Sequence, residues 1–74
     1  MIANIANDIE NAEEGFLYDL DILTPRGVRK IRGTFISVDS DKMIVEFEPA
    51  GYRYHTRIEL SYAEILKVEG AEGG

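Results

Sequence analysis

Apolar residues at the start of the chain recur at helical spacing, three or four positions apart. The stripe they form consists of Ile2, Ile5, Ile9 and Ala12. Polar and acidic residues fill the other positions, and Gly15 follows where a glycine typically ends a helix. The pattern predicts a helix over about residues 2–14. Because its apolar stripe is narrow, we expect this helix to pack on a larger body.

From residue 16 onward apolar and polar residues alternate with a period of two, the spacing of β-strands. The alternation predicts five strands, over about residues 16–23, 28–38, 43–48, 52–60 and 65–69. Turn residues rich in Pro, Gly and Asp separate the first four strands. Residues 61–64 have the S-x-x-E spacing of a capping box, but they lie between two strands, so we expect a single 3₁₀ turn there.

Alternation also predicts which side chains of the later strands lie on the same face. In the third strand the inward set is Met43, Val45 and Phe47. In the fourth, one face carries Tyr52, Tyr54, Thr56, Ile58 and Leu60. The opposite face of the fourth strand carries Arg53, His55, Arg57 and Glu59.

Gly33 interrupts the longest predicted strand. A glycine within a strand has no side chain to pack and usually marks a bulge, a bend or a close approach of another backbone. This strand then ends in an acidic turn at Asp39, which together with the bend is typical of a small, tightly curled barrel. The pattern favours an SH3-like or Sm-like barrel over about residues 16–69. An OB-fold fits less well, because it needs longer strands and a helix between the third and fourth.

Length and composition indicate one domain, over residues 1–70, followed by a disordered tail at 71–74. In 74 residues a core supplies only about 3–5 kcal/mol, so such chains commonly need a further source of stability. The chain has no cysteine and a single histidine, which exclude disulfides and disfavour a structural metal site. Self-association is the remaining source of further stability. No apolar run is long enough to cross a membrane and no secretory signal is present, so we expect a cytoplasmic protein.

The net charge of −6 opposes nucleic-acid binding, which depends mostly on Lys and Arg. The charge is unevenly distributed along the chain. The first 21 residues carry acids and no base, whereas residues 26–32 carry four bases and no acid. Arg53, His55 and Arg57 form a second basic cluster. Local basic patches are therefore compatible with an acidic chain.

Gly33, Phe35 and Asp39 resemble the first motif of the Sm-like proteins, the family of the Sm and Lsm proteins and the bacterial RNA chaperone Hfq. The likeness covers residues 3–69, with the helix and the 61–64 link where the family has its N-terminal helix and second motif. It implies a homo-oligomeric ring of about five to seven subunits, closed by pairing the fourth strand of one subunit with the fifth of the next. It also implies single-stranded RNA binding near the lumen of that ring.

The residues matched to the RNA site are Asp41 and Lys42 in one turn and Ser61 and Tyr62 in the later link. Tyr62 is the best stacking candidate, and a place in the core or in a subunit interface is an equal alternative. Alternative phosphate contacts are Arg53, His55 and Arg57, for which we favour pairing with Glu46 and Glu48. The bases of 26–32 have the same two interpretations, with Asp19 and Asp21 as partners.

No catalytic or metal constellation stands out. Asp39 and Asp41 are candidates for a metal or acid–base pair, but turn residues that bond the local backbone are the favoured interpretation. His55 has no second histidine and no nucleophile beside it. We therefore expect no enzyme, no cofactor and no metal. The alternative to RNA binding is a protein-interaction or structural assembly module whose acidic face binds a basic partner.

Overall fold

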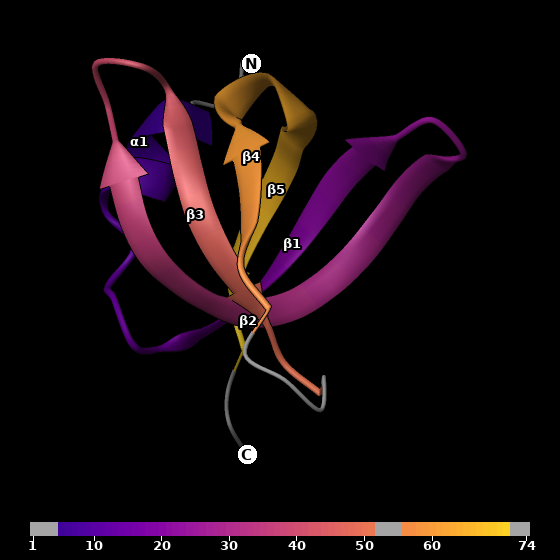
Figure 1. The fold of residues 1–74 in the computed structure, drawn as a ribbon, viewed down its shortest axis with the longest axis horizontal. Helices are drawn as coiled ribbons and strands as arrows, with labels where there is room; N and C mark the ends of the chain where they lie inside the picture. Colours follow the sequence, from indigo (N-terminus) through magenta and orange to yellow (C-terminus); the bar gives the residue numbers. More distant parts are fainter. Residues whose placement is uncertain (1–4, 52–55, 72–74) are drawn as a thin grey trace.

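The computed structural model describes residues 5–51 and 56–71 and shows a mainly β protein with a short N-terminal helix (Figure 1). The elements are, in order, α1 (Ile5–Glu10), β1 (Leu17–Thr24), β2 (Gly27–Asp39), β3 (Ile44–Pro49), β4 (Ile58–Ser61), the 3₁₀ turn η1 (Tyr62–Glu64) and β5 (Ile65–Gly70). The predicted order of one helix, five strands and a 3₁₀ turn before the last strand is confirmed.

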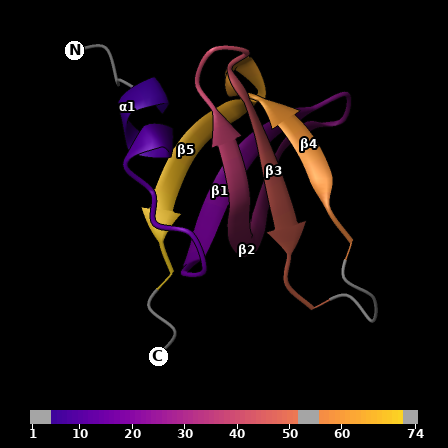
Figure 2. The same cartoon turned by 60° about the vertical axis from the view of Figure 1, so that its left-hand side comes forward.

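The five strands form one antiparallel sheet in the order β4-β3-β2-β1-β5. Strands β4 and β5 are its two edges, and within the described residues no pairing joins them. The sheet is curved but open, as Figure 2 shows. The structure therefore contains the strands of the expected barrel without its closure.

At Gly33 the backbone of β2 lies against β3, with Pro49 opposite. A Cβ atom built there would collide with the backbone of Glu48, and would lie 2.8 Å from both Pro49 Cα and Phe47 Cε2. The pairing register between β2 and β3 shifts a little further along, between Phe35 and Ser37. Gly33 is thus required for a close backbone approach, as predicted, and β2 curves across the whole sheet (Figure 1).

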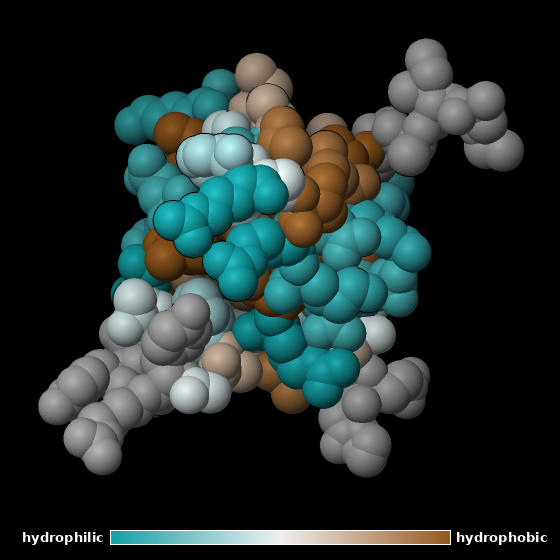
Figure 3. Space-filling model, turned by 90° about the vertical axis from the view of Figure 1, so that its right-hand side faces the viewer, coloured by the Kyte–Doolittle hydropathy of each residue, from teal (hydrophilic) through white to brown (hydrophobic). Residues whose placement is uncertain are grey.

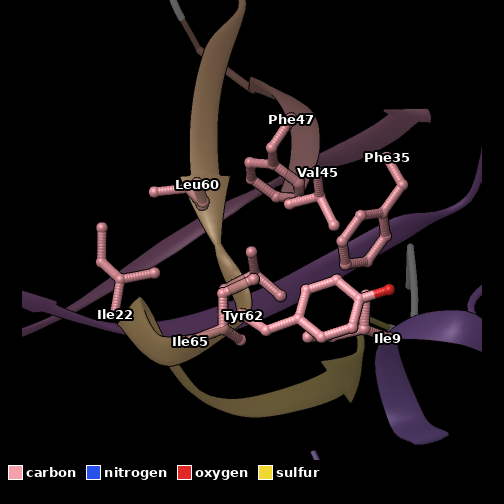
Figure 4. Close-up of a cluster of buried hydrophobic side chains, with 9 residues drawn as sticks. Ile9, Ile22, Phe35, Val45, Phe47, Leu60, Tyr62 and Ile65 are labelled. Carbon is pink, nitrogen blue, oxygen red and sulfur yellow. The ribbon is translucent and has the colours of Figure 1, made fainter. Parts of the chain in front are cut away.

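Side chains from the sheet, from α1 and from η1 point toward one another and form the core (Figure 4). It comprises Ile9, Leu20, Ile22, Phe35, Val45, Phe47, Leu60, Tyr62 and Ile65. The ring of Phe35 makes edge-to-face contacts with Tyr18 and Phe47, each with centroids 5.3 Å apart. Ile9 is the buried residue of α1, which confirms that the helix packs on the sheet.

The helix ends earlier than predicted, because the chain leaves helical geometry after Glu10. The backbone N–H of Asn11 bonds Asn7 (3.0 Å), but that of Ala12 bonds Ile9 in a tighter turn (3.2 Å). The N–H of Glu13 then bonds the Tyr18 hydroxyl instead of the helix (2.8 Å). Gly15 adopts a positive φ of 86° in the following turn and does not cap the helix.

Two predictions for the later strands are wrong. Met43, expected to point inward, has a positive φ of 55° in the β2–β3 turn and is exposed, because β3 begins only at Ile44. Thr56 and Arg57, predicted to belong to the fourth strand, lie outside β4, which begins at Ile58, and Thr56 is exposed. Tyr52 and Tyr54, predicted to share a strand face with Ile58 and Leu60, lie outside the described residues.

At the C-terminal end β5 runs to Gly70, and the backbone N–H of Ala71 bonds the carbonyl of Leu17 at 2.9 Å. Ala71, predicted to begin the tail, therefore still contacts β1, and residues 72–74 lie outside the described part. No helix of the described residues is both long and apolar enough to span a membrane.

Candidate functional site

The β2–β3 turn is held by the side chain of Asp39. Its Oδ1 accepts hydrogen bonds from the backbone N–H groups of Asp41 and Lys42, both at 3.1 Å. Asp39 is therefore a turn residue, as the favoured interpretation predicted. Among the described residues no three His, Cys, Asp or Glu side chains are grouped so that they could hold a metal ion.

The two segments matched to the RNA site lie together at one end of the sheet. Ser61 pairs with Ile44, and the backbone N–H of Tyr62 donates to the carbonyl of Met43 at 2.9 Å. Ser61 is itself fixed by Glu64, whose Oε1 accepts from its backbone N–H (3.0 Å) and its Oγ (3.1 Å). The structure thus places the Asp41–Lys42 turn beside the Ser61–Tyr62 link.

Tyr62 belongs to the core. Its side chain is 6 % exposed, and its hydroxyl donates a hydrogen bond to Glu10 Oε2 at 3.1 Å. Burial, with this hydrogen bond, raises the pKa of the Tyr62 phenol. A base cannot stack on the ring without displacing the packing around it. Of the two roles left open for Tyr62, the structure shows the core role.

A hollow of about 210 Å³ opens on the sheet surface beside Lys42. It is lined by Ser37, Asp39, Lys42, Ile44, Glu46 and Glu59. Glu46 and Glu59 are directly opposite each other on β3 and β4, and Glu46 also accepts a hydrogen bond from Ser37 Oγ at 3.0 Å. Three carboxylates therefore surround the lysine on which phosphate binding at this end would depend.

Replacing Glu59 with lysine is expected to raise stability. Like charges directly opposite on neighbouring strands are unfavourable, and the change turns the Glu46–Glu59 repulsion into an attraction of about 0.2–1 kcal/mol. Urea unfolding of the variant measures this shift, with Glu59→Gln as a control that only removes the charge. An unchanged or lower midpoint for Glu59→Lys would show that the two carboxylates do not interact.

The first basic cluster lies on the β1–β2 arm, by which we mean residues 22–31 at the tip of that hairpin. At its base Arg32 makes a bidentate contact with Asp19, at 2.8 and 3.0 Å, and Lys30 lies 3.9 Å from Asp21. The hydrogen bond from Arg32 lowers the pKa of the Asp19 carboxyl. The predicted cross-strand pairing is confirmed for these two bases.

Arg26 and Arg29, further out on the arm, have no ion-pair partner in the described part of the chain. Of the second basic cluster, Arg57 is the member that belongs to the described residues. Its Nε lies 3.9 Å from Glu48 Oε1, in agreement with the pairing interpretation. Arg53 and His55 lie outside the described residues. Among the described residues, Arg26 and Arg29 are thus two exposed arginines without an ion-pair partner.

The chain matches no protein-family model, no curated protein and no solved structure. The fold and the distribution of charge on it are therefore the basis for inferring a function.

Proposed function

We propose that this chain is an Sm-like assembly module whose copies join edge to edge, β4 of one pairing with β5 of the next, into a ring. The observation that carries the proposal is the open sheet, whose two edge strands have no partner among the described residues. An unpaired edge presents a row of backbone donors and acceptors to which another strand adds readily. When two copies pair through these edges, the backbone donors and acceptors of β4 and of β5 gain partners.

Two further features support edge-to-edge assembly. The core is small, with nine buried hydrophobic residues in the described part of the chain, and such a core gains from a partner surface. The edges β4 and β5 are different surfaces, so their contact is heterologous, and a heterologous contact closes into a ring when its rotation permits. The bent β2 supplies the curvature that such a closed arrangement needs.

Replacing Leu66 with lysine is expected to break the assembly while leaving the fold intact. Leu66 is exposed on the edge strand β5, and a charged side chain on an edge opposes strand addition. Light scattering should show a lower mass for Leu66→Lys than for the unaltered chain, at similar melting temperatures. The matched control is Met43→Lys, which adds the same charge at an exposed residue of the β2–β3 turn. Equal loss of mass in both variants would show that the edge is not the interface.

Single-stranded RNA is the ligand that we propose for such a ring, because the Asp41–Lys42 turn and the Ser61–Tyr62 link converge. With Tyr62 in the core, the remaining contacts are few and polar. Five copies would carry a net charge of about −30, which repels a polyanion at long range. We therefore expect weak, local binding.

Lys42→Glu is expected to weaken the binding of oligo-U and oligo-A to the ring. Because few phosphates are contacted, the logarithm of the affinity should fall only slowly with the logarithm of the salt concentration. The slope should correspond to the release of roughly one to three ions. Fluorescence anisotropy at low salt measures both quantities. If neither oligonucleotide binds the unaltered chain, the alternative function, a structural module that binds a basic protein through its acidic surface, takes the place of RNA binding.

A further inference from the structure

The two edges of the sheet are flanked by opposite charges. The β1–β2 arm lies beside the start of β4: the two together line a hollow of about 480 Å³. Its walls are Ile22, Thr24, Arg29, Lys30, Ile31, Pro49, Thr56 and Ile58. The basic arm therefore flanks the β4 edge at the end where β4 begins.

The arm extends beyond the rest of the sheet (Figure 1). Strand β5 pairs with β1 only as far as Ile22, and β3 pairs with β2 only from Gly33. Near its tip Leu23 and Val28 face each other across the hairpin and are 51 % and 58 % exposed. Figure 3 views the molecule from the side of the arm and shows hydrophobic and strongly hydrophilic residues adjoining one another. With Arg26 and Arg29, the tip offers both charge and apolar area.

The β5 edge is flanked by acids. Helix α1 contacts β5, and the segment that follows it, residues 13–16, leads into β1 where Leu17 bonds Ala71 at the end of β5. We call residues 13–16 the acidic segment, because Glu13 and Glu14 are exposed there. Phe16 is 60 % exposed in the same segment. This region thus complements the arm, with carboxylates and an exposed apolar side chain.

The strand directions bring these two regions together. If β4 of one copy and β5 of the next are antiparallel, as all neighbours in this sheet are, the start of β4 lies opposite the end of β5. The arm flanks the start of β4, and the acidic segment flanks the end of β5. Parallel pairing would instead place the arm near η1 of the neighbour.

We propose that the β1–β2 arm is a docking element for a second copy of this chain, with Arg26 and Arg29 contacting Glu13 and Glu14 of the neighbour. Leu23 and Val28 supply the apolar part of the contact, against Phe16. This inference rests on the proposed edge-to-edge assembly and adds to it a charge contact that selects the antiparallel direction.

A nucleic acid is the competing occupant of the arm, and the charges favour the second copy. The net charge of −6 repels a polyanion and another copy alike at long range, so the local position of opposite charges decides between the two. A neighbouring copy offers its carboxylates at the position that strand pairing dictates, and the surfaces that meet differ, as a head-to-tail contact requires.

Charge reversal with light scattering at low salt tests the contact. Arg26→Glu/Arg29→Glu and Glu13→Lys/Glu14→Lys should each weaken association at least tenfold, because each variant places like charges at the interface. The variant with all four changes keeps the net charge of the unaltered chain and should recover its mass. An equimolar mixture of the two double variants should also assemble. Met43→Lys, in the β2–β3 turn away from the arm, should leave the mass unchanged.

Four outcomes would overturn the inference. Arg26→Glu/Arg29→Glu with full mass would remove the arm from the interface and leave the ring proposal standing. The same variant with full mass but lost oligonucleotide binding would assign the arm to nucleic acid. A four-residue variant that is folded by circular dichroism but stays dissociated would show that the charges do not pair with each other. A monomeric unaltered chain would instead contradict the ring itself, and with it this contact.

Discussion

Gly33→Val is expected to abolish the folded state at room temperature. The new Cβ would overlap the backbone of Glu48, and Pro49 Cα and Phe47 Cε2 would lie only 2.8 Å away. Backbone atoms cannot move aside as the end of a flexible side chain can, so β2 and β3 would have to separate. We expect a cost above about 3 kcal/mol, comparable with the whole stability of a core of this size.

Circular dichroism melting measures this effect, and Gly70→Val is the matched control. Gly70 also lies in a strand, but a Cβ there meets nothing within 4 Å, so its melting temperature should stay close to that of the unaltered chain. A Gly33→Val protein that melts like the unaltered chain would contradict the close approach of β2 to β3.

Tyr62→Ala is expected to destabilise the chain by about 3–5 kcal/mol, the usual cost of removing a large buried aromatic side chain. Tyr62 closes the core between α1 and the sheet, as Figure 4 shows, and its loss would leave a cavity beside Ile9. Tyr62→Phe keeps the ring and loses only the hydrogen bond to Glu10, worth about 1 kcal/mol.

Urea unfolding of the two Tyr62 variants distinguishes the core role from the stacking role. The core role predicts a large loss of stability for alanine and a small one for phenylalanine. An alanine variant as stable as the unaltered chain, but with weaker oligonucleotide binding, would show that the aromatic ring of Tyr62 contacts a ligand. Burial of the Tyr62 ring against α1 and the sheet predicts the opposite result.

The elements that the sequence predicted well are those with a strong local signal. Gly33 stands alone in a strand-forming run, and the close approach of β3 follows from its missing side chain. The alternation of Asp19 and Asp21 predicted pairing with Lys30 and Arg32, because register places them opposite one another on the hairpin.

The features that could not be predicted depend on tertiary contacts. The early end of α1 follows from the bond between Glu13 and the Tyr18 hydroxyl, which no local pattern encodes. For Tyr62 the sequence left a core place and a stacking role open, because its contact with α1 joins residues more than fifty positions apart. Met43 continues the alternation of β3, but the turn held by Asp39 places it outside the strand.

The native mass of the chain tests the central claim most directly. Native mass spectrometry or light scattering at low salt should give one species at a whole-number multiple of 8.3 kDa, with about five or more copies. Such a mass is what pairing of β4 with β5 around a closed ring predicts. A single species of 8.3 kDa at all concentrations would show that the two edges remain unpaired and would contradict the proposed assembly.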